Sequence, residues 1–210
     1  MPRLSTIRER LEAFEPPVIG RPDLAEAAVA VLLRERAERL EMLFIERSKR
    51  EGDPWSGHMA FPGGRREAED GSARAAAERE THEEIGIPVE AAEYLGLLAE
   101  LQGNPRFRQS QLVVSAHVFH VPKPGPFVLE EREVADAMWF PVADLLDAER
   151  HVEYSTARTG EMKFPGVVVG DPERHIVWGL TYRFLDIFMG AIEMPLPDRW
   201  GGFAGFRVDD

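Results

Sequence analysis

The sequence predicts an α/β fold in which a few helices cover a mixed β-sheet. Short apolar runs of strand length are interspersed with a few helical segments, without the regular strand–helix alternation of a parallel sheet. The chain has 210 residues, of which 44% are hydrophobic and 30% charged. A single domain with a substantial core is therefore expected over residues 1–210.

The elements can be assigned in chain order. Residues 4–14 form an amphipathic helix that caps the edge of the domain and stops before two prolines. Apolar and β-branched runs predict strands at residues 25–33, 42–45, 94–101, 111–121, 134–140 and 164–170. Helices are expected at residues 72–85, 141–146 and 175–189, and loops at 49–58, 147–163 and after 195. The core is expected at about 25–147, with an N-terminal helix and a C-terminal helical extension.

Composition excludes several classes of function. The chain has no cysteine, so thiolate chemistry and disulfides are absent. No apolar run approaches the roughly 20 residues of a membrane span, and the first residues lack the apolar core of a signal peptide, so a cytoplasmic location is expected. The net charge of −12 disfavours nucleic acid. It suits a small phosphorylated substrate whose charge is offset by metal ions.

The helix predicted at 72–85 carries the strongest chemical signal. Glu80, Glu83 and Glu84 fall within roughly a 100° arc of this helix and share one face. A solvated charged face fits poorly, because like charges one turn apart repel and negative charge before Gly86 opposes the helix dipole. Arg79 can offset only one carboxylate. Clustered carboxylates beside glycine-rich backbone favour a site for a hard divalent cation.

The segment from Phe61 to Ile87 resembles the Nudix box, G-x5-E-x7-R-E-U-x-E-E-x-G-U, where U is a bulky aliphatic residue. Gly64 matches the first glycine, and the distal half is matched by Arg79, Glu80, Glu83, Glu84, Gly86 and Ile87. Asp70 replaces the first glutamate and is followed by one residue more than the pattern has, in a turn that tolerates insertion. Thr81 replaces a larger aliphatic residue.

The resemblance implies an α/β/α sandwich and a hydrolase that acts on phosphoric anhydrides with Mg²⁺ or Mn²⁺. It implies that Glu80, Glu84 and the carbonyl of Gly63 hold the metal. Glu83 is then an accessory ligand in the catalytic set, and Arg79 orients the carboxylates. The spacing of Glu80 and Glu84, one helical turn apart, suits ions about 3.5–4 Å apart that neutralise a diphosphate and orient water.

A further acid often lies outside the box in this family and acts as a base or a ligand. Glu133 is the candidate here, and Glu130 and Glu131 are close competitors. For each of the three, an ordinary surface glutamate is an equally good interpretation.

Within the family, the chain is most similar to the coenzyme A pyrophosphatase branch. Its features are matched by Arg47-Ser48, Gly57, the Phe-Pro-Gly-Gly of residues 61–64 and the segment 178–181. One arginine of the branch pattern is displaced, with Arg50 the nearest. This resemblance favours coenzyme A or a derivative as substrate.

Candidate substrate-binding residues are Arg47, Arg106 and Arg108. The last two flank an aromatic residue and suit a phosphate clamp, although a solvated loop explains them equally well. Trp178 is better explained as a core residue than as a substrate platform.

Other functions remain open. ADP-ribose, dinucleotide polyphosphates or other nucleotides are alternative substrates of the same fold. A non-catalytic nucleotide-binding module is a remote alternative, because such a module is expected to have lost some glutamates. An isomerase of the isopentenyl diphosphate type shares the fold but normally employs cysteine. The sequence leaves open whether a homodimer forms.

Overall fold

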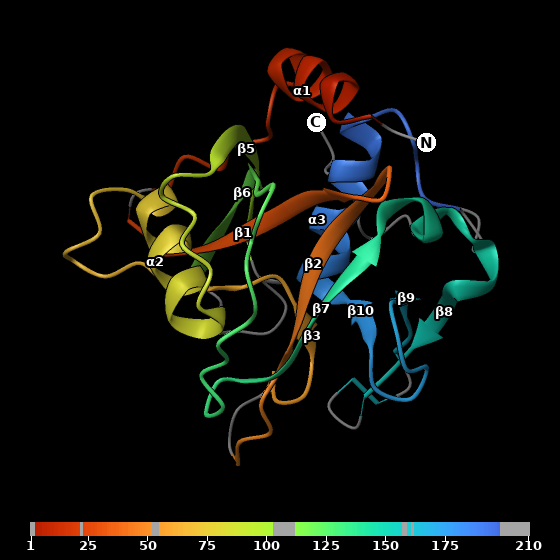
Figure 1. The fold of residues 1–210 in the computed structure, drawn as a ribbon. Coiled ribbons are helices and arrows are strands. Elements are labelled where there is room, and N and C mark those ends of the chain that lie inside the picture. The colour runs from red at the N-terminus through yellow and green to blue at the C-terminus, as the bar shows by residue number, and fades with distance from the viewer. Residues whose placement is uncertain are drawn as a thin grey trace.

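The computed structural model describes residues 3–21, 23–51, 55–102, 112–156, 159–160 and 162–197. Arg106 and Arg108 lie outside the described residues, so the structure does not place this candidate phosphate clamp. Within the described residues, a seven-stranded mixed sheet lies between α2 (Ala73–Ile85) and α3 (Gly179–Ala191), and α1 (Leu4–Ala13) lies across one end (Figure 1). The predicted α/β architecture is confirmed.

The main sheet has the strand order β3-β2-β1-β6-β5, with β4 paired to β1 and β7 paired to β2. Its strands are β1 (Ala25–Arg36), β2 (Arg39–Arg47), β3 (Met59–Ala60), β4 (Gly63–Arg65), β5 (Glu93–Gln102), β6 (Leu112–His120) and β7 (Val134–Pro141). The β1–β6 pair is parallel, and the other pairs of this sheet are antiparallel. The sheet is therefore mixed.

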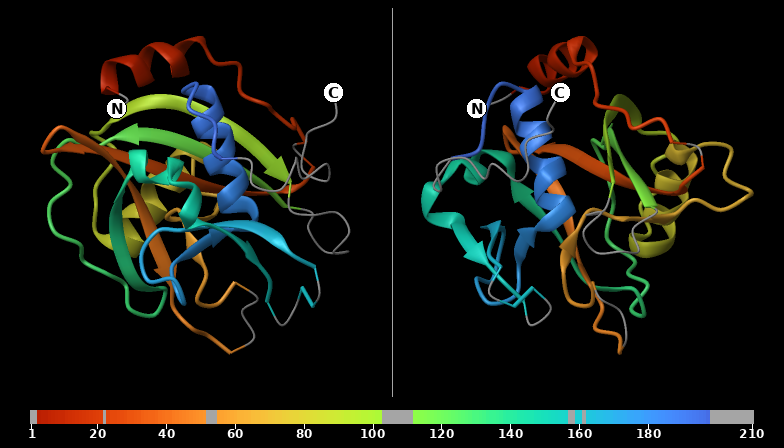
Figure 2. Two further views of the ribbon diagram at one scale, coloured as in Figure 1. Left: turned by 90° about the vertical axis from the view of Figure 1, so that its right-hand side faces the viewer. Right: turned by 180° about the vertical axis from the view of Figure 1, so that it is seen from behind.

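Two hydrophobic cores flank the sheet. One core, which we call the α2-side core, contains Ala76, Ala77 and Ile85 of the helix with residues of β1 and β2. The larger α3-side core joins the opposite face of the sheet to α1 and α3 (Figure 2). Small alanines let α2 approach β1 closely, and the helix also contacts β4.

The hairpin of β1 and β2 is longer than the apolar runs predict. Its charged end is paired as far as Arg36 and Arg39, so the segment between the runs is mostly strand. Ala37 and Glu38 form the two-residue turn with φ of 48° and 62°, the left-handed conformation that suits a tight hairpin. Charged strand residues are stable here because this end of the hairpin is exposed.

The part of the chain after residue 147 differs from its prediction. The expected loop over 147–163 contains β8 (His151–Tyr154), and the segment expected to be helical from residue 175 begins as β10 (Ile176–Trp178). With β9 (Phe164–Val168), these strands form a second antiparallel sheet in the order β10-β9-β8. Two short 3₁₀ helices, η1 (Val142–Leu146) and η2 (Ala148–Arg150), precede it. The C-terminal extension is thus a small sheet as well as a helix.

An ion pair joins the second sheet to the first. Glu46 of β2 has a side chain only 4% exposed, and its Oε2 lies 2.6 Å from Nη2 of Arg174 and 3.6 Å from Nε2 of His175. Buried carboxylates need such partners. No described helix is long and apolar enough to cross a membrane.

Candidate functional site

Helix α2 presents its glutamates in a fixed phase because both of its ends are capped. The Oγ of Ser72 accepts a hydrogen bond from the N–H of Ala75 at 3.1 Å, which is an N-cap. Gly86 ends the helix with φ of 72°, a left-handed conformation that favours glycine. The helix therefore begins and ends where the sequence predicts.

The strand β4 lies against α2 because its glycines have no side chains. A Cβ on Gly63 would lie 2.2 Å from the carbonyl oxygen of Ala28, and one on Gly64 would lie 2.4 Å from the carboxylate carbon of Glu80. The N–H of Gly63 donates to Oε2 of Glu84 at 2.8 Å. Glycine at both positions brings backbone and carboxylates into direct contact.

A turn far along the chain is attached to the end of α2. We call residues 130–133 the acid turn. The N–H of Glu130 donates to the carbonyl of Glu84 at 3.0 Å, and the N–H of Val128 donates to that of Ile85 at 3.0 Å. These bonds satisfy carbonyls that the end of a helix leaves without partners. They also bring Glu133 to the glutamates of the helix.

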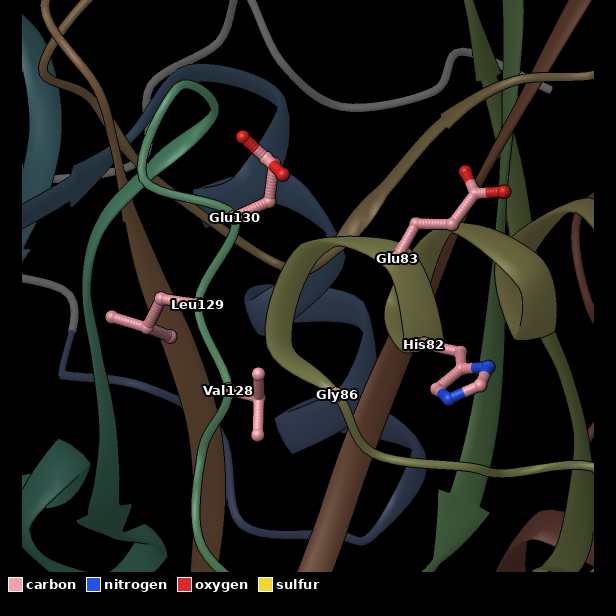
Figure 3. Close-up of a pocket in the computed structure, with 6 residues that line it drawn as sticks. All are labelled: His82, Glu83, Gly86, Val128, Leu129 and Glu130. Atoms are coloured by element: carbon pink, nitrogen blue, oxygen red, sulfur yellow. The ribbon is translucent and has the colours of Figure 1, made fainter.

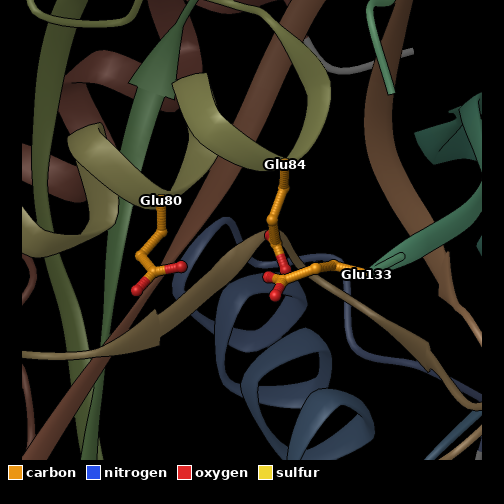
Figure 4. Close-up of side chains that lie close together, drawn as sticks. All are labelled: Glu80, Glu84 and Glu133. Atoms are coloured by element: carbon orange, nitrogen blue, oxygen red, sulfur yellow. The ribbon is translucent and has the colours of Figure 1, made fainter. Parts of the chain in front are cut away.

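Three carboxylates meet at this junction. Oxygens of Glu80, Glu84 and Glu133 lie within 4.8 Å of one another (Figure 4). Glu84 is buried, with a side chain 2% exposed, whereas 43% of the Glu133 side chain is exposed. The group is therefore anchored inside the protein and open toward solvent on the Glu133 side.

The electrostatics of the site are unfavourable to three negative charges. Burial is the main cause that raises the pKa of Glu84 to about 8, and the carboxylates of Glu80 and Glu133 add to the effect. The N–H of Gly63 and the guanidinium of Arg47 act in the opposite direction. Burial also raises the pKa of Glu80. A cation between the carboxylates would relieve this repulsion.

The guanidinium of Arg79 donates hydrogen bonds to several neighbouring residues. It contacts both oxygens of Asp70, at 3.1 and 3.0 Å, and donates to Glu80 at 3.0 Å and Glu83 at 2.9 Å. It also donates to the carbonyl of Arg65 at 3.1 Å. The hydrogen bonds from Arg79 hold the pKa of Asp70 below its usual range. Arg79 thus fixes the carboxylates rather than reaching outward.

The loop after β2 holds the acid turn from the other side. The N–H and hydroxyl of Ser48 donate to the carbonyls of Glu133 and Glu131, each at 2.8 Å. Nε of Arg50 donates to the carbonyl of Arg132 at 2.6 Å, and its Nη2 lies 3.4 Å from Oε1 of Glu133. The orientation of Glu133 therefore depends on this loop.

A shallow pocket of about 280 Å³ lies beside the end of α2 (Figure 3). It is lined by His82, Glu83, Gly86, Val128, Leu129 and Glu130. The carboxylates of Glu83 and Glu130 point toward the same end of the pocket. A Cβ on Gly86 would lie 2.7 Å from Cβ of Val128, so this glycine allows the close approach of the two walls.

Comparison with known proteins identifies the family. The NUDIX domain model matches residues 24–158, which include α2, β4 and the acid turn. The chain belongs to the Nudix family. The Nudix domain, together with the hydrolase relatives described next, makes it a pyrophosphohydrolase, and helix α2 with the preceding glycines lies within the matched segment.

Relatives match different lengths of this Nudix chain. A Nudix hydrolase named NudL, of uncharacterised activity, from Salmonella paratyphi B is 30% identical over 180 residues, covering 86% of this chain and 81% of that protein. An uncharacterised protein from Schizosaccharomyces pombe is 39% identical over 129 residues, covering 59% of this chain. The match spans only 39% of the length of that protein.

Solved structures are similar at lower identity. The NUDIX domain of Shewanella oneidensis NrtR, complexed with ADP ribose, has 22% identity and a TM-score of 0.47, covering 65% of this chain and 80% of that one. A C. elegans Ap4A hydrolase has 21% identity and a TM-score of 0.48, covering 59% of this chain and 85% of that one.

The Nudix site of this chain fits a divalent cation. Its donors are carboxylate oxygens, which Mg²⁺ and Mn²⁺ prefer, and they converge where a buried carboxylate lacks full compensation. Glu80, Glu84 and Glu133 could hold the ion together with backbone oxygen near Gly63. Which ion binds, and how many, stays a prediction.

The structure brings together most of the predicted residues but not all. Glu80, Glu84 and Glu133 converge, and Nη1 of Arg47 lies 3.8 Å from Oε1 of Glu84. Glu83 does not join that group, because its carboxylate contacts Arg79 and lines the pocket. The catalytic roles assigned to Glu83, Glu133 and Arg79 stay predictions.

Sequence reasoning missed how the acid turn is held. In sequence, Ser48 and Arg50 lie at or near positions of the coenzyme A branch pattern, whereas the structure brings them into contact with the turn that carries Glu133. No local pattern could have indicated this, because the contacts join residues more than eighty positions apart.

Replacing Arg50 by alanine is expected to lower kcat/KM about three- to tenfold, because the acid turn loses a hydrogen bond and Glu133 loses a neighbouring cation. Arg50→Lys should recover part of the activity, since it keeps the charge but not the two-pronged contact. The measurement is kcat/KM at saturating metal, together with Mn²⁺ affinity. Lys49→Ala removes one exposed positive charge from the same loop and is the matched control. Equal activity in Arg50→Ala and Lys49→Ala would contradict the role.

Proposed function

We propose that the protein is a metal-dependent pyrophosphohydrolase that cleaves the diphosphate linkage of a nucleoside diphosphate-linked small molecule. The observation that carries this proposal is the convergence of Glu80, Glu84 and Glu133 within 4.8 Å beside the side-chain-free backbone of Gly63 and Gly64. A diphosphate approaching this junction meets backbone instead of side chains, so its oxygens can come close to ions held by the carboxylates.

The reaction adds water across a phosphoric anhydride. A P–O bond of the bridge breaks, an O–P bond to water forms, and one proton leaves. Mg²⁺ or Mn²⁺, when bound, supplies positive charge for the phosphate oxygens and lowers the pKa of water. Glu133 is the half-exposed carboxylate of the group and can accept the proton. Arg79 keeps Glu80 in place, and Arg47, beside Glu84, can reach a phosphate oxygen.

Coenzyme A or a derivative is the substrate that we propose first. The Arg47-Ser48 pair and the Phe-Pro-Gly-Gly entry to the box support this choice through the resemblance to the coenzyme A branch. Cleavage would then give 4′-phosphopantetheine and 3′,5′-adenosine diphosphate. ADP-ribose or a dinucleotide polyphosphate is the alternative, because the carboxylate group recognises the diphosphate and not the attached groups. We also propose a cytoplasmic location.

A substrate panel tests the choice. With Mg²⁺ or Mn²⁺, kcat/KM for coenzyme A is expected to exceed that for ADP-ribose, diadenosine polyphosphates and nucleoside triphosphates by about tenfold or more, the equivalent of about 1.4 kcal/mol. Product analysis should give the two fragments named above. A tenfold preference for ADP-ribose or a diadenosine polyphosphate would reject coenzyme A and leave the pyrophosphohydrolase proposal intact. Absence of turnover for every diphosphate would reject the proposal itself.

A further inference from the structure

Four rings from separate segments meet at the edge of the second sheet. Trp178 is at the centre, with ring centroids 4.9 Å from His58, 5.3 Å from Tyr154 and 5.6 Å from Phe164. The rings are tilted or edge-on to Trp178, with interplanar angles of 69°, 52° and 56°. We call these four residues the Trp178 cluster.

The Trp178 cluster is not a continuation of either hydrophobic core. Within the described part of the chain, Trp178, Tyr154 and Phe164 belong neither to the α2-side core nor to the α3-side core, nor to the apolar residues packed against them. All four residues are half-buried, so part of each residue remains accessible to solvent. Trp139 differs, since it packs against the α2-side core and is stacked with Phe127. The expectation that Trp178 is a core residue is therefore not met.

The Trp178 cluster lies close to the carboxylates in the fold. The carbonyl of His58 accepts a hydrogen bond from the N–H of Arg47 at 3.0 Å, and Nη1 of that arginine lies 3.8 Å from Oε1 of Glu84. Strand β10, which ends at Trp178, contacts β3 (Figure 1). Paired strands are about 4.8 Å apart, and His58, directly before β3, lies beside Arg47 of β2. His58 of the Trp178 cluster is therefore one strand spacing from the arginine that contacts the buried Glu84.

We propose that the Trp178 cluster is a binding site for the planar base of the substrate, with the diphosphate held at the carboxylates. This assignment rests on the proposed function. The exposed surfaces of aromatic rings favour a flat, neutral π-system, and a nucleobase is the flat part of a nucleotide. The protein has a net charge of −12, so aromatic rings can provide the affinity for a nucleotide that basic side chains provide in other proteins.

The Trp178 cluster is held rigidly enough to orient a base. Tyr154, Phe164 and Trp178 lie in the second sheet. That sheet is joined to β2 by the 2.6 Å contact of Arg174 with Glu46. Glu46 directly precedes Arg47 in that strand. The base site and the carboxylate site are therefore positioned by neighbouring residues of one strand, which fixes the distance between them.

Two ligands that differ only in the base test the inference. Binding of AMP and of ribose 5-phosphate is measured by calorimetry with Mg²⁺ present, and neither ligand contains an anhydride that could be cleaved. Wild-type protein is expected to bind AMP at least about fivefold more tightly, the scale of one stacked base. In Trp178→Leu the two ligands should bind equally. The preference should persist in Trp139→Leu, which removes an indole elsewhere.

Circular dichroism and thermal unfolding establish that each variant is folded. If Trp178→Leu does not fold, Tyr154→Leu takes its place, and the preference for AMP should shrink in it. Equal binding of both ligands to wild type would overturn the inference, and so would an undiminished preference in folded Trp178→Leu. Loss of hydrolysis activity with the preference retained would reject the proposed function and leave the base site standing.

Discussion

Replacing Glu84 by glutamine is expected to lower kcat/KM by a factor of about 10³ or more, the scale of losing a preorganised electrostatic element. Glutamine keeps the size of the side chain, and its carbonyl oxygen can still accept the 2.8 Å hydrogen bond from Gly63. The change therefore removes the negative charge and spares the packing. Steady-state kinetics with Mg²⁺ at several concentrations measure the effect.

Glu78→Gln is the matched control for this prediction. Glu78 lies on the same helix and pairs with Arg74 at 2.7 Å, away from the carboxylate group. Its loss should cost about 0.3–0.5 kcal/mol of stability, the worth of an i,i+4 pair, and leave turnover unchanged. If both variants lost activity equally, the assignment of the helix face to the site would be wrong.

Divalent metal is expected to raise the thermal unfolding midpoint by about 5–10 °C at a hundredfold excess over its dissociation constant. Ligand linkage gives about 2.7 kcal/mol under that condition, and about 2–4 °C accompany each kcal/mol in a chain of this size. The physical reason is the repulsion among Glu80, Glu84 and Glu133, which a cation relieves. Thermal unfolding with Mg²⁺ or Mn²⁺ is compared with unfolding in EDTA.

Glu84→Gln also serves as the control for metal stabilisation. With one carboxylate neutralised, the variant should gain much less from metal, and its unfolding midpoint in EDTA should lie at or above that of the wild type because it no longer buries a carboxylate. An unchanged wild-type midpoint at saturating metal would refute the metal site. A gain of the same size in both proteins would place the stabilising ion somewhere else.

The sequence predicted α2 and two of the three grouped carboxylates, Glu80 and Glu84, because their signals are local. Ser72 and Gly86 define the ends of the helix by capping chemistry, and helical periodicity then fixes where Glu80 and Glu84 lie. Glu133 could not be separated from its neighbours by sequence. It joins the group through hydrogen bonds from the acid turn to the end of α2 and to the loop after β2.

The second sheet escaped prediction for a different reason. Strands β8 and β10 have four and three residues, too few for an alternating pattern to emerge. Their stability comes from pairing with β9, which is a tertiary property. A helical period extending back to residue 175 therefore hid a short strand before α3.

The contact between Glu46 and Arg174 indicates which part of the chain folds as one cooperative unit. The Nudix match ends at residue 158, but Arg174 lies beyond it. A chain cut at that boundary would lose Arg174 and His175, the two partners of the Glu46 carboxylate. The cut would also remove Phe184, Phe188 and Met189 of α3 from the α3-side core, and each large side chain lost from a core costs on the order of 2–5 kcal/mol. The segment matched by the family model and the segment that folds as one unit therefore do not coincide in this protein.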